Sequence, residues 1–560
     1  MTMDPRTAPS LGDAIAASIE LHGTRLALIE ADRERENGRW TYAQLGAESE
    51  RFAALLQGHG VAAGDRVAIL MSNQFKWIAS AVGGFWAGAV VVPVDVRQPP
   101  EEHRSLLAHA APRALVVEYP VWERLAPVAG GLGGALVVAC EAPAGAELHG
   151  AVRWEDPPSG RFTRRSRAPD DVATVVYSSG TAGTPKGCML HHRTYLRQAQ
   201  MVGGVCRIGG EDRYMSILPT SHTTDFTVGF ILPLLSGASI VHQRTMRPQF
   251  LSASMRTYQA TFTVMAPRVL EQFERRLRAR LASVPDWPER LAAHRAGPSR
   301  PGEFPPWLDA IIDAELGSQL RLIMIGGAFV ERGLAAFFHE LGIPVAVGYG
   351  LTEAGTVVSI SDPRAPFDGA CHPLPGIELE VRDAADDGVG EIWLRSPTLM
   401  GGYLAAPELT QAALVDGWLR TGDLGRLEPD GRLRIVGRAK NMIVTSGGKN
   451  VYPEDIESHF EGLPDCAELC VFAENYLWPA RTMVGEGLVA VLRPDRGAPS
   501  QALLDELRRR NRELAEYKRL RGLVAWTRPF PTTASHKLQR DTLADQLRAA
   551  LDRTAVVTLR

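Results

Sequence analysis

Short continuous apolar runs alternate with longer amphipathic segments along the first part of the chain. The short runs are rich in Val, Ile and Leu, and they predict buried β-strands. They occupy 25–32, 65–73, 90–96, 113–119 and 134–140. Helices are predicted over 11–23 and 41–57, and Thr41 is a candidate N-cap residue for the second. The alternation of strands and helices predicts an α/β fold built on a parallel sheet.

The same alternation continues through the middle of the chain. A helix is predicted near His191, and the segment 226–241 predicts a buried helix followed by a strand. Strands at 320–330 and 344–355 each end in glycines. The segment 282–306 is rich in Pro and Arg, and we interpret it as an irregular surface insertion with a solvated basic face rather than a contact for an acidic partner or lipid.

The pattern changes after 438–440. Before this point, two β-hairpins are predicted over 391–403 and 417–438, the second with a turn at the sequence EPDG. After it, a hairpin around the sequence SGGKN, several strands and amphipathic helices predict an α+β unit of common domain size. The chain therefore divides into a large α/β part and a smaller α+β part.

Size and composition agree with more than one domain. The chain has 560 residues, of which 45% are hydrophobic, so it can bury far more than one small core. Its formal net charge of −3 argues against nucleic acid as the main partner. The six cysteines form no Cys-x-x-Cys pair, which favours a reducing compartment without disulfides or zinc. Cys466 and Cys470 are four residues apart, and a shared apolar face is favoured over a metal pair.

The N-terminus lacks a basic region followed by an apolar one, so no signal peptide is predicted and a cytoplasmic location is expected. The stretches 77–94 and 226–243 contain no charged residue. Glycine and proline interrupt both of them, and each is interpreted as a buried helix and strand rather than a membrane span of about 20 residues.

The stretch Tyr177 to Gly187, with the sequence YSSGTAGTPKG, combines hydroxyls, glycines and one lysine after an apolar strand. Glycines let backbone N–H groups turn toward a ligand, and hydroxyls and Lys186 add donors and charge, which suits a polyphosphate. The spacing differs from that of a Walker A loop. A flexible surface loop is the alternative, and the loop alone does not decide between the two.

Three further motifs carry groups that a nucleotide requires. The sequence YGLTE places Glu353 at the end of a buried strand, where its carboxylate could bind Mg²⁺. RTGD places Asp423 in a turn, where it could accept hydrogen bonds from ribose hydroxyls, and Arg438 could add a donor. SHKLQR places Lys537 in a loop near the C-terminus, where it could neutralise developing charge. Taken one at a time, Glu353 could cap a helix, Asp423 could bond only within its own turn, and Lys537 could be a solvated lysine. Together, the three motifs favour nucleotide chemistry.

With these motifs in this order, the chain resembles the adenylate-forming superfamily, which groups acyl- and aryl-CoA synthetases, peptide-synthetase adenylation domains and luciferases. YSSGTAGTPKG resembles the phosphate loop of the family, with Ser178 and Ala182 where threonine is common, and YGLTE, RTGD, GRAK and SHKLQR also match. The resemblance covers nearly the whole chain. It implies an N-terminal domain over 1–437 with a β-barrel-like part, a hinge at 438–440 that includes Lys440, and a mobile domain over 441–560.

The resemblance also implies a two-step reaction with ATP, Mg²⁺ and coenzyme A, in which an acid becomes an acyl-AMP and then a thioester. Lys537, Glu353, Thr181 and Lys186 are the implied catalytic residues, and Glu353 is the implied metal ligand. The phosphate loop is expected to hold the β- and γ-phosphates, which leave as pyrophosphate. The implied ATP- and coenzyme-binding residues are Ser178, Ser179, Gly180, Thr181, Gly183, Thr184, Lys186, Gly327, Ala328, Gly348, Tyr349, Gly350, Thr352, Asp423, Arg438, Lys440, Gly447 and Gly448.

The acid is less well defined. His222 matches a pocket histidine common in acyl- and aryl-CoA synthetases, and Phe226 falls where fatty-acid members often carry an aromatic gate. Each could instead be an ordinary core residue. Gly326 and Gly350 are also expected at the acid. Asp225, three residues after His222, and the sequence VTSGGKNVYPEDIE resemble long-chain acyl-CoA synthetases. Asp225 is out of register with the aspartate that holds the amine in amino-acid-activating members, so a fatty or other apolar acid is favoured over an amino acid.

Three functional hypotheses stay open on the sequence. The first is an acyl-CoA synthetase, and the second is an acyl-AMP ligase that loads a separate carrier protein. The third is a non-catalytic nucleotide sensor, which would be expected to lack Lys537, Glu353 or Asp423; all three are present. The sequence does not define the oligomeric state, and a homodimer is one option.

Overall fold

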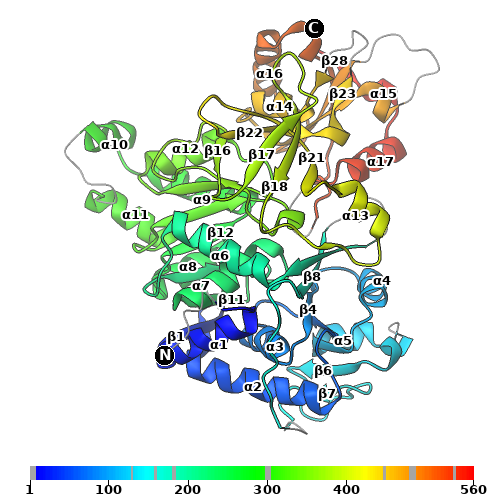
Figure 1. The fold of residues 1–560 in the computed structure, drawn as a ribbon. Coiled ribbons are helices and arrows are strands. Elements are labelled where there is room, and N and C mark those ends of the chain that lie inside the picture. Colours follow the sequence, from blue (N-terminus) through cyan, green and yellow to red (C-terminus); the bar gives the residue numbers. More distant parts are fainter. Residues whose placement is uncertain are drawn as a thin grey trace.

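The computed structural model describes residues 8–127, 130–156, 161–178, 185–296, 304–444, 450–478, 487–533 and 538–559. Within these ranges two sheets and the helices around them build the large N-terminal part, and a smaller α+β part follows it at the top of Figure 1. The predicted fold class, a large α/β part with a smaller C-terminal α+β part, is confirmed.

The larger sheet runs from an N-terminal hairpin to an antiparallel region late in the chain. Its described strands follow the order β17-β18-β21-β22-β16-β15-β14-β13-β12-β10-β11-β1-β2, and β20 pairs with β21. One part of this sheet, from β14 to β2 in the strand order, contains β1 (Leu26–Asp32), β2 (Arg35–Thr41), β10 (Arg213–Ser216), β11 (Ser239–Gln243), β12 (Phe262–Met265), β13 (Leu322–Gly326) and β14 (Val345–Tyr349). The antiparallel region contains β15 (Ser359–Ile360), β16 (Ala370–Pro373), β17 (Glu378–Arg382), β18 (Gly390–Arg395), β20 (Leu414–Val415), β21 (Trp418–Leu427) and β22 (Leu433–Arg438).

The second sheet lies below the first in Figure 1 and has the order β19-β9-β8-β4-β3-β5-β6-β7. Its strands are β3 (Arg66–Leu70), β4 (Val90–Pro93), β5 (Ala114–Glu118), β6 (Leu136–Cys140), β7 (Val152–Arg153), β8 (Val172–Ser178), β9 (Lys186–His191) and β19 (Gly402–Tyr403). The strands from β4 through β3 and β5 to β6 are parallel, as the apolar runs predict.

Helices fill the layers on both faces of these sheets. The largest core contains residues of both sheets and is filled by α1 (Leu11–His22), α2 (Tyr42–Gly58), α3 (Phe75–Trp86), α6 (His192–Cys206), the π-helix η3 (Asp225–Ile231) and α7 (Leu232–Ser236). A second core packs the larger sheet against α8 (Pro248–Thr257), α9 (Pro267–Leu281), α11 (Pro306–Leu316) and α12 (Arg332–Glu340). A third packs the second sheet against α4 (Pro100–Ala110) and α5 (Tyr119–Leu125).

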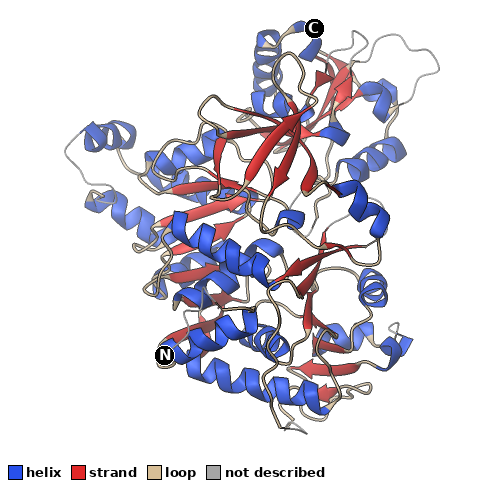
Figure 2. Cartoon of the chain, viewed as in Figure 1, coloured by secondary structure: helices blue, strands red, loops and turns tan. Residues whose placement is uncertain are grey.

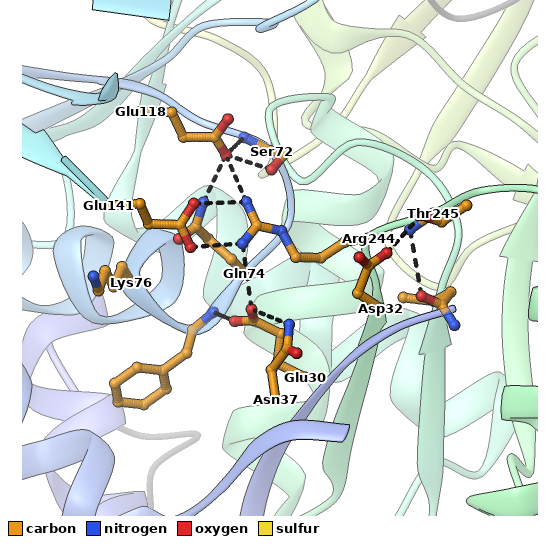
Figure 3. A network of polar contacts seen from close by, with 12 residues as sticks. Glu30, Asp32, Asn37, Ser72, Gln74, Lys76, Glu118, Glu141, Arg244 and Thr245 are labelled. Carbon is orange, nitrogen blue, oxygen red and sulfur yellow. Dashed lines mark hydrogen bonds and ion pairs between the residues drawn. The ribbon is translucent and has the colours of Figure 1, made fainter. Parts of the chain in front are cut away.

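One arginine joins the ends of strands from both sheets (Figure 3). Arg244, just after β11, contacts Glu141 after β6 at 2.6 Å and lies 3.6 Å from both Glu118 of β5 and Glu30 of β1. Gln74 donates a further hydrogen bond to Glu118 at 2.6 Å. The three carboxylates hold the pKa of Arg244 above its usual range, although burial opposes this. This cluster fixes how the two sheets are joined.

The smaller part forms two cores on opposite faces of a sheet with the order β25-β26-β27-β28. The strands are β25 (Cys466–Ala473), β26 (Leu488–Pro494), β27 (Leu520–Ala525) and β28 (Val557–Thr558), with a separate hairpin of β23 (Ile443–Val444) and β24 (Asn450–Val451). The helices are α14 (Pro453–His459), α15 (Glu474–Leu477), α16 (Gln501–Glu513) and α17 (Arg540–Ala550). Figure 2 shows these helices around the strands of this part.

Local sequence signals explain several element boundaries. Thr41 caps α2 as predicted, because its hydroxyl accepts from the backbone N–H of Gln44 while the Gln44 side chain accepts from Thr41 N. The hairpin predicted at EPDG is formed by β21 and β22. The charge-free segments are buried within the N-terminal part, and in the described ranges no helix combines the length and apolarity needed to cross a bilayer.

Three local predictions are wrong. The segment 391–403 does not form a hairpin, because β18 pairs with β17 and β21 whereas β19 pairs with β9 in the second sheet. The segment 282–306 contains the helix α10 (Trp287–Ala296), because Leu291 is buried in the second core and Arg290 stacks on Trp307. Cys466 and Cys470 lie on one strand but face different cores. A break in the strand register between Cys466 and Glu468 turns the chain over, so their spacing does not place them on a shared face.

Candidate active site

The carboxyl ends of two parallel strands form the centre of the site. β13 and β14 pair in register, with Gly326 opposite Gly348. A Cβ atom at Gly326 would clash with the Gly348 carbonyl oxygen, so only glycine fits. A Cβ atom at Gly350 would clash with the carbonyl oxygen of Thr356. Glycine is thus required for the chain to leave β14 and fold back on itself, independently of any ligand.

Glu353 lies in this returning turn, in the short 3₁₀ helix η4 (Thr352–Ala354). Its Oε1 accepts a hydrogen bond from Tyr403 Oη at 2.9 Å. Tyr403 lies on β19, which pairs with β9, so the tyrosine reaches Glu353 from the second sheet. Burial and the neighbouring carboxylate raise the pKa of the Tyr403 hydroxyl, which keeps it protonated and donating.

Asp423 is held from two sides on β21. Its Oδ1 pairs with Arg438 Nε at 2.7 Å, and its Oδ2 accepts from Tyr349 Oη at 2.6 Å. The Asp423 side chain is only 4% exposed, whereas Arg438 is 45% exposed. The structure therefore brings together three residues that the sequence places in different motifs: Tyr349, Asp423 and Arg438.

The phosphate-loop residues lie only partly within the described ranges. Ser178, the last residue of β8, pairs with Lys186, the first residue of β9, so these two close the base of the loop. Ser179, Gly180, Thr181, Gly183 and Thr184 lie outside the described residues, as do Gly447, Gly448 and Lys537. Their roles stay predictions.

A cavity of about 70 Å³ opens beside the ends of β13 and β14. Its wall combines aliphatic side chains with threonine hydroxyls and glycine backbone. The lining residues are His222, Thr223, Thr224, Val228, Val264, Met324, Ile325, Gly326, Gly327, Gly348, Tyr349, Gly350, Leu351, Thr352, Thr356 and Val357. An adjoining cavity of about 50 Å³ shares His222, Thr224, Gly326 and Gly327 with it. His222 thus lies between the two spaces.

The π-helix η3 forms one wall of the larger cavity but directs its residues differently from the sequence-based prediction. Val228 lines the cavity. Phe226 is fully buried among Tyr195, Phe230 and Trp77, and it does not line either cavity. That Phe226 acts as a gate for the acid stays a prediction, because Phe226 lines neither cavity in this conformation.

Asp225, beside Phe226, is fully buried and accepts hydrogen bonds from Tyr214 Oη and from Thr220 Oγ1 at 2.8 Å. Burial raises the pKa of Asp225 to about 7. Because these hydroxyls surround it, Asp225 is a buried structural group in this conformation, which agrees with the inference that it is not an amine-binding aspartate.

Thr356 is the strained residue of the cavity wall. Its φ of 139° is one that β-branched residues rarely adopt. Its hydroxyl contacts Thr227 Oγ1 at 2.9 Å and the Thr223 carbonyl oxygen at 3.2 Å. These contacts tie the turn after β14 to the start of η3, so two walls of the cavity are held together.

The other predicted residues occupy the rim. Gly327 and Ala328 follow β13 and are exposed, and Gly327 has a φ of +81°. Thr352 Oγ1 contacts Thr223 Oγ1 at 3.1 Å. Lys440 lies exposed in the 3₁₀ helix η5 (Ala439–Asn441), between β22 and the smaller part.

Sequence reasoning missed Tyr403, Thr356 and the aliphatic wall residues Val264 and Met324. The only sequence signal for Tyr403 is the GGY that ends the predicted 391–403 hairpin, and nothing there indicates its partner strand. The wall residues belong to apolar runs whose other members are ordinary core residues.

Comparison with known proteins places this geometry in a family. Residues 15–404 match the family model of the AMP-binding enzyme. A 3-[(3aS,4S,7aS)-7a-methyl-1,5-dioxo-octahydro-1H-inden-4-yl]propanoyl:CoA ligase of Rhodococcus jostii is 31% identical over 84% of this chain and 86% of its own length. The long-chain-fatty-acid–CoA ligase FadD13 of Mycobacterium tuberculosis is 28% identical over 92% of this chain and 94% of its own length. The crystal structure of ATP-bound MatB from Rhodopseudomonas palustris shares the fold, with a TM-score of 0.79, 24% identity, and 98% and 100% of the two chains covered.

Proposed function

Because this chain belongs to the AMP-binding enzyme family within the adenylate-forming acyl-CoA synthetases, we propose that it activates an apolar carboxylic acid as its acyl-AMP and then transfers the acyl group to coenzyme A. ATP, Mg²⁺ and coenzyme A are the reactants and cofactor of this chemistry. The observation that carries the proposal is that Tyr349, at the end of β14, lines the larger cavity and donates to Asp423, which pairs with Arg438. Glu353 lies in the turn directly after the same strand, held by Tyr403.

In the first step, a carboxylate oxygen of the acid attacks the α-phosphorus of ATP. The bond from that phosphorus to the bridging oxygen breaks, and pyrophosphate leaves with its electron pair. Positioning and charge neutralisation provide most of the acceleration in such transfers. In the second step, the sulfur of coenzyme A attacks the acyl carbonyl carbon, the bond to AMP breaks, and AMP leaves while the thiol gives up its proton.

We assign the nucleotide to the edge formed by Tyr349, Asp423 and Arg438. Each Asp423 oxygen carries more than one lone pair, so the carboxylate can accept ribose hydroxyls while it keeps Arg438 and Tyr349. The Arg438 side chain is 45% exposed while it pairs with Asp423, which suits a contact with the sugar or a phosphate.

Glu353 is suited to hold Mg²⁺ together with the phosphates of ATP. Mg²⁺ is usually bound by one or two carboxylates plus substrate phosphates and water, and a single carboxylate fits that pattern. Across the described residues no group of three or more potential metal-ligating side chains is formed, so a cation here would depend on the nucleotide. The ion would neutralise charge on the phosphates. Tyr403 donates to one Glu353 oxygen and thereby fixes the direction in which the other oxygen points.

We propose that Lys537 supplies the positive charge for adenylation and that the smaller part, 441–560, rotates on the hinge at 438–440 between the two steps. Lys186 and the loop hydroxyls, Thr181 among them, then hold the β- and γ-phosphates. In support, the base of this loop is closed by the Ser178–Lys186 pair, and Lys440 lies in the connection that a rotation would use.

The size of the cavities favours a compact acid. A single water needs about 10–15 Å³ of cavity, so the larger cavity of about 70 Å³ accommodates only a few non-hydrogen atoms beyond the carboxylate. A short, compact acid fits this space better than an extended long chain. The relatives differ in this respect, since one is named for a bicyclic propanoyl group and another for long-chain fatty acids.

The acceptor and the assembly are further parts of the proposal. Coenzyme A is favoured because the named relatives are coenzyme A ligases. Loading of a carrier protein is the second candidate. A cytoplasmic location stays a prediction, and a homodimer stays one option for the assembly.

The test measures AMP release with a panel of acids that includes a short-chain acid, an indole acid, a cinnamic acid and palmitate, each with coenzyme A or holo-carrier protein as acceptor. Turnover with coenzyme A and a compact apolar acid is expected. Turnover only with a carrier protein would make the chain an acyl-AMP ligase. Absence of AMP with every combination would favour a nucleotide sensor and contradict the proposal.

A further inference from the structure

A buried ion-pair cluster in the smaller part joins the residue that follows the Lys537 loop to the hinge. Its centre is Arg540, the first residue of α17. Arg540 Nη2 contacts Glu457 Oε2 at 2.5 Å and lies 3.6 Å from Glu454 Oε1, both on α14. The three side chains are between 14% and 18% exposed. The guanidinium is therefore held largely away from solvent by two carboxylates.

The second nitrogen of the guanidinium is also engaged. Arg540 Nη1 donates to the Val471 carbonyl oxygen at 3.0 Å and contacts Cys470 Sγ at 3.1 Å, both on β25. Glu457 in turn accepts from the backbone N–H of Val471 at 2.6 Å. Arg540 is thus fixed in two directions, to a helix and to the central sheet of the smaller part.

Glu454 carries the cluster to the hinge. Its Oε1 accepts from Asn441 Nδ2 at 2.6 Å, and Asn441 is the last residue of η5, directly after Lys440. On the other side, a Cβ atom at Gly437 would lie 2.7 Å from Glu454 Oε2. The Glu454 carboxylate is therefore packed against the chain immediately before and immediately after the hinge.

Arg540 also lies close to the base of the Lys537 loop. Thr532 and Leu538 form an isolated β-bridge, and Gln539 N donates to the Pro531 carbonyl oxygen at 2.9 Å. These contacts hold together the described chain before and after 534–537, and Arg540 anchors the chain two residues after Leu538. Three residues span at most about 11 Å, so a shift of Arg540 is transmitted to the attachment of Lys537.

We propose that Arg540 is a positioning residue for adenylation, which sets the attachment of Lys537 and, through Glu454 and Asn441, links it to the hinge. This inference rests on the proposed role of Lys537. An arginine holds this place because its planar fork binds a carboxylate and two β25 acceptors at once, which a lysine ammonium does not reproduce.

The test separates the two half-reactions. Pyrophosphate exchange reports adenylation, and thioester formation from supplied acyl-AMP reports the second step. Arg540→Lys keeps the positive charge between Glu454 and Glu457 but loses the fork. We expect exchange to fall by about ten- to hundredfold, as for small misplacements of a reacting group, while the second step stays near the wild-type rate. An equal loss in both steps, or no loss in either, would overturn the proposal.

Two further variants keep the result interpretable. Arg510→Lys changes another partly buried arginine of the smaller part, which pairs with Glu506 on its own helix, α16, at 2.7 Å, and it should leave the ratio of the two rates unchanged. Asn441→Ala removes only the contact to Glu454, and it should lower exchange in the same direction as Arg540→Lys. An unchanged exchange rate in Asn441→Ala would overturn the link to the hinge.

Lys537→Ala is assayed beside them. Its proposed role predicts loss of exchange with the second step retained. Normal exchange in Lys537→Ala would refute the proposed function of that lysine, whereas loss of exchange there with a normal Arg540→Lys refutes the positioning role alone. Thermal unfolding of every variant identifies any that fails to fold, and Arg540→Gln, which keeps hydrogen-bond donors without charge, replaces Arg540→Lys in that case.

Discussion

Tyr403 donates a hydrogen bond to Glu353 at 2.9 Å, although Tyr403 lies on β19 of the second sheet, Glu353 lies in the turn after β14 of the larger sheet, and the two are 50 positions apart. The tyrosine fixes which way the carboxylate faces. Partners of this kind, which hold a metal ligand without touching the metal, typically contribute about 10- to 100-fold to metal affinity or activity. The bond therefore predicts a measurable effect on Mg²⁺ use.

Tyr403→Phe should raise the Mg²⁺ concentration needed for half-maximal pyrophosphate exchange by about tenfold. Thioester formation from supplied acyl-AMP should change little, because its chemistry does not involve the pyrophosphate-bound cation. Tyr42→Phe is the matched control, since it removes a buried hydroxyl that donates to the Ala238 carbonyl oxygen at 2.7 Å in the N-terminal core. An unaltered Mg²⁺ dependence in Tyr403→Phe would remove Glu353 as the cation ligand.

Asp423→Asn should weaken ATP binding and reduce the discrimination between ATP and 2′-deoxy-ATP. Hydrogen bonds to a charged acceptor contribute about 1.5–3 kcal/mol, so the KM for ATP should rise by roughly ten- to hundredfold. The measurement is the ratio of kcat/KM for the two nucleotides in wild type and variant. Retention of the wild-type ratio would show that Asp423 does not contact the ribose 2′-hydroxyl.

Met324→Ala should move acid preference toward bulkier substrates. Met324 lines the larger cavity, and each methylene-sized change in such a pocket alters specificity by about 1–3 kcal/mol. The ratio of kcat/KM for a two-ring acid to that for a short-chain acid should rise by at least about tenfold. Met265→Ala, which truncates a methionine in the second core rather than at the cavity, serves as the control and should leave that ratio unchanged.

The contact between the two parts of the chain should loosen as pH rises. Burial raises the pKa of Glu461, just after α14, to about 8, with Glu331 of the large part adding to it and Arg332 opposing it. Burial, with Glu271 and Glu274, raises the pKa of Glu331 to about 7. Both carboxyl groups bind protons more tightly when the two parts are in contact than when they are apart. The stabilisation that this gives to the contact is therefore fully present near pH 4 and is lost as pH rises through about 7 to 8.

Hydrogen exchange of the residues around Glu461, measured from pH 6 to 9 and corrected for intrinsic exchange, tests this dependence. Protection should fall across that range in wild type and much less in Glu461→Gln. Glu516→Gln, at an exposed position of the same part, should behave like wild type. Protection that stays constant with pH in wild type would contradict the expected coupling.

The sequence predicts most elements of the large part because their signals are local. Thr41 carries its cap partner three residues away, and the strands that end at Gly326 and Tyr349 are uninterrupted apolar runs. The site motifs could also be found, because glycine, hydroxyl and carboxylate residues cluster at these strand ends. Asp423 and Arg438 are 15 positions apart but adjacent across the β21–β22 hairpin, and the turn signal that joins them is readable.

The remaining features depend on contacts that are distant in sequence. Tyr403 reaches Glu353 only because β19 pairs with β9. Phe226 lies in an aromatic core because the segment winds as a π-helix, which places Val228 rather than Phe226 at the cavity. The bulge beside Cys466 changes which core that residue faces, and no single residue in the segment signals it.

The aliphatic wall of the acid cavity and the Asp423–Arg438 pair come from different elements. Val228, Val264 and Met324 lie on η3, β12 and β13, whereas Asp423 and Arg438 lie on the β21–β22 hairpin. Tyr349 belongs to both sets, because it lines the cavity and donates to Asp423. Substitutions at the three aliphatic positions can therefore retune the choice of acid while the nucleotide contacts stay in place, whereas a change at Tyr349 would alter both functions at once.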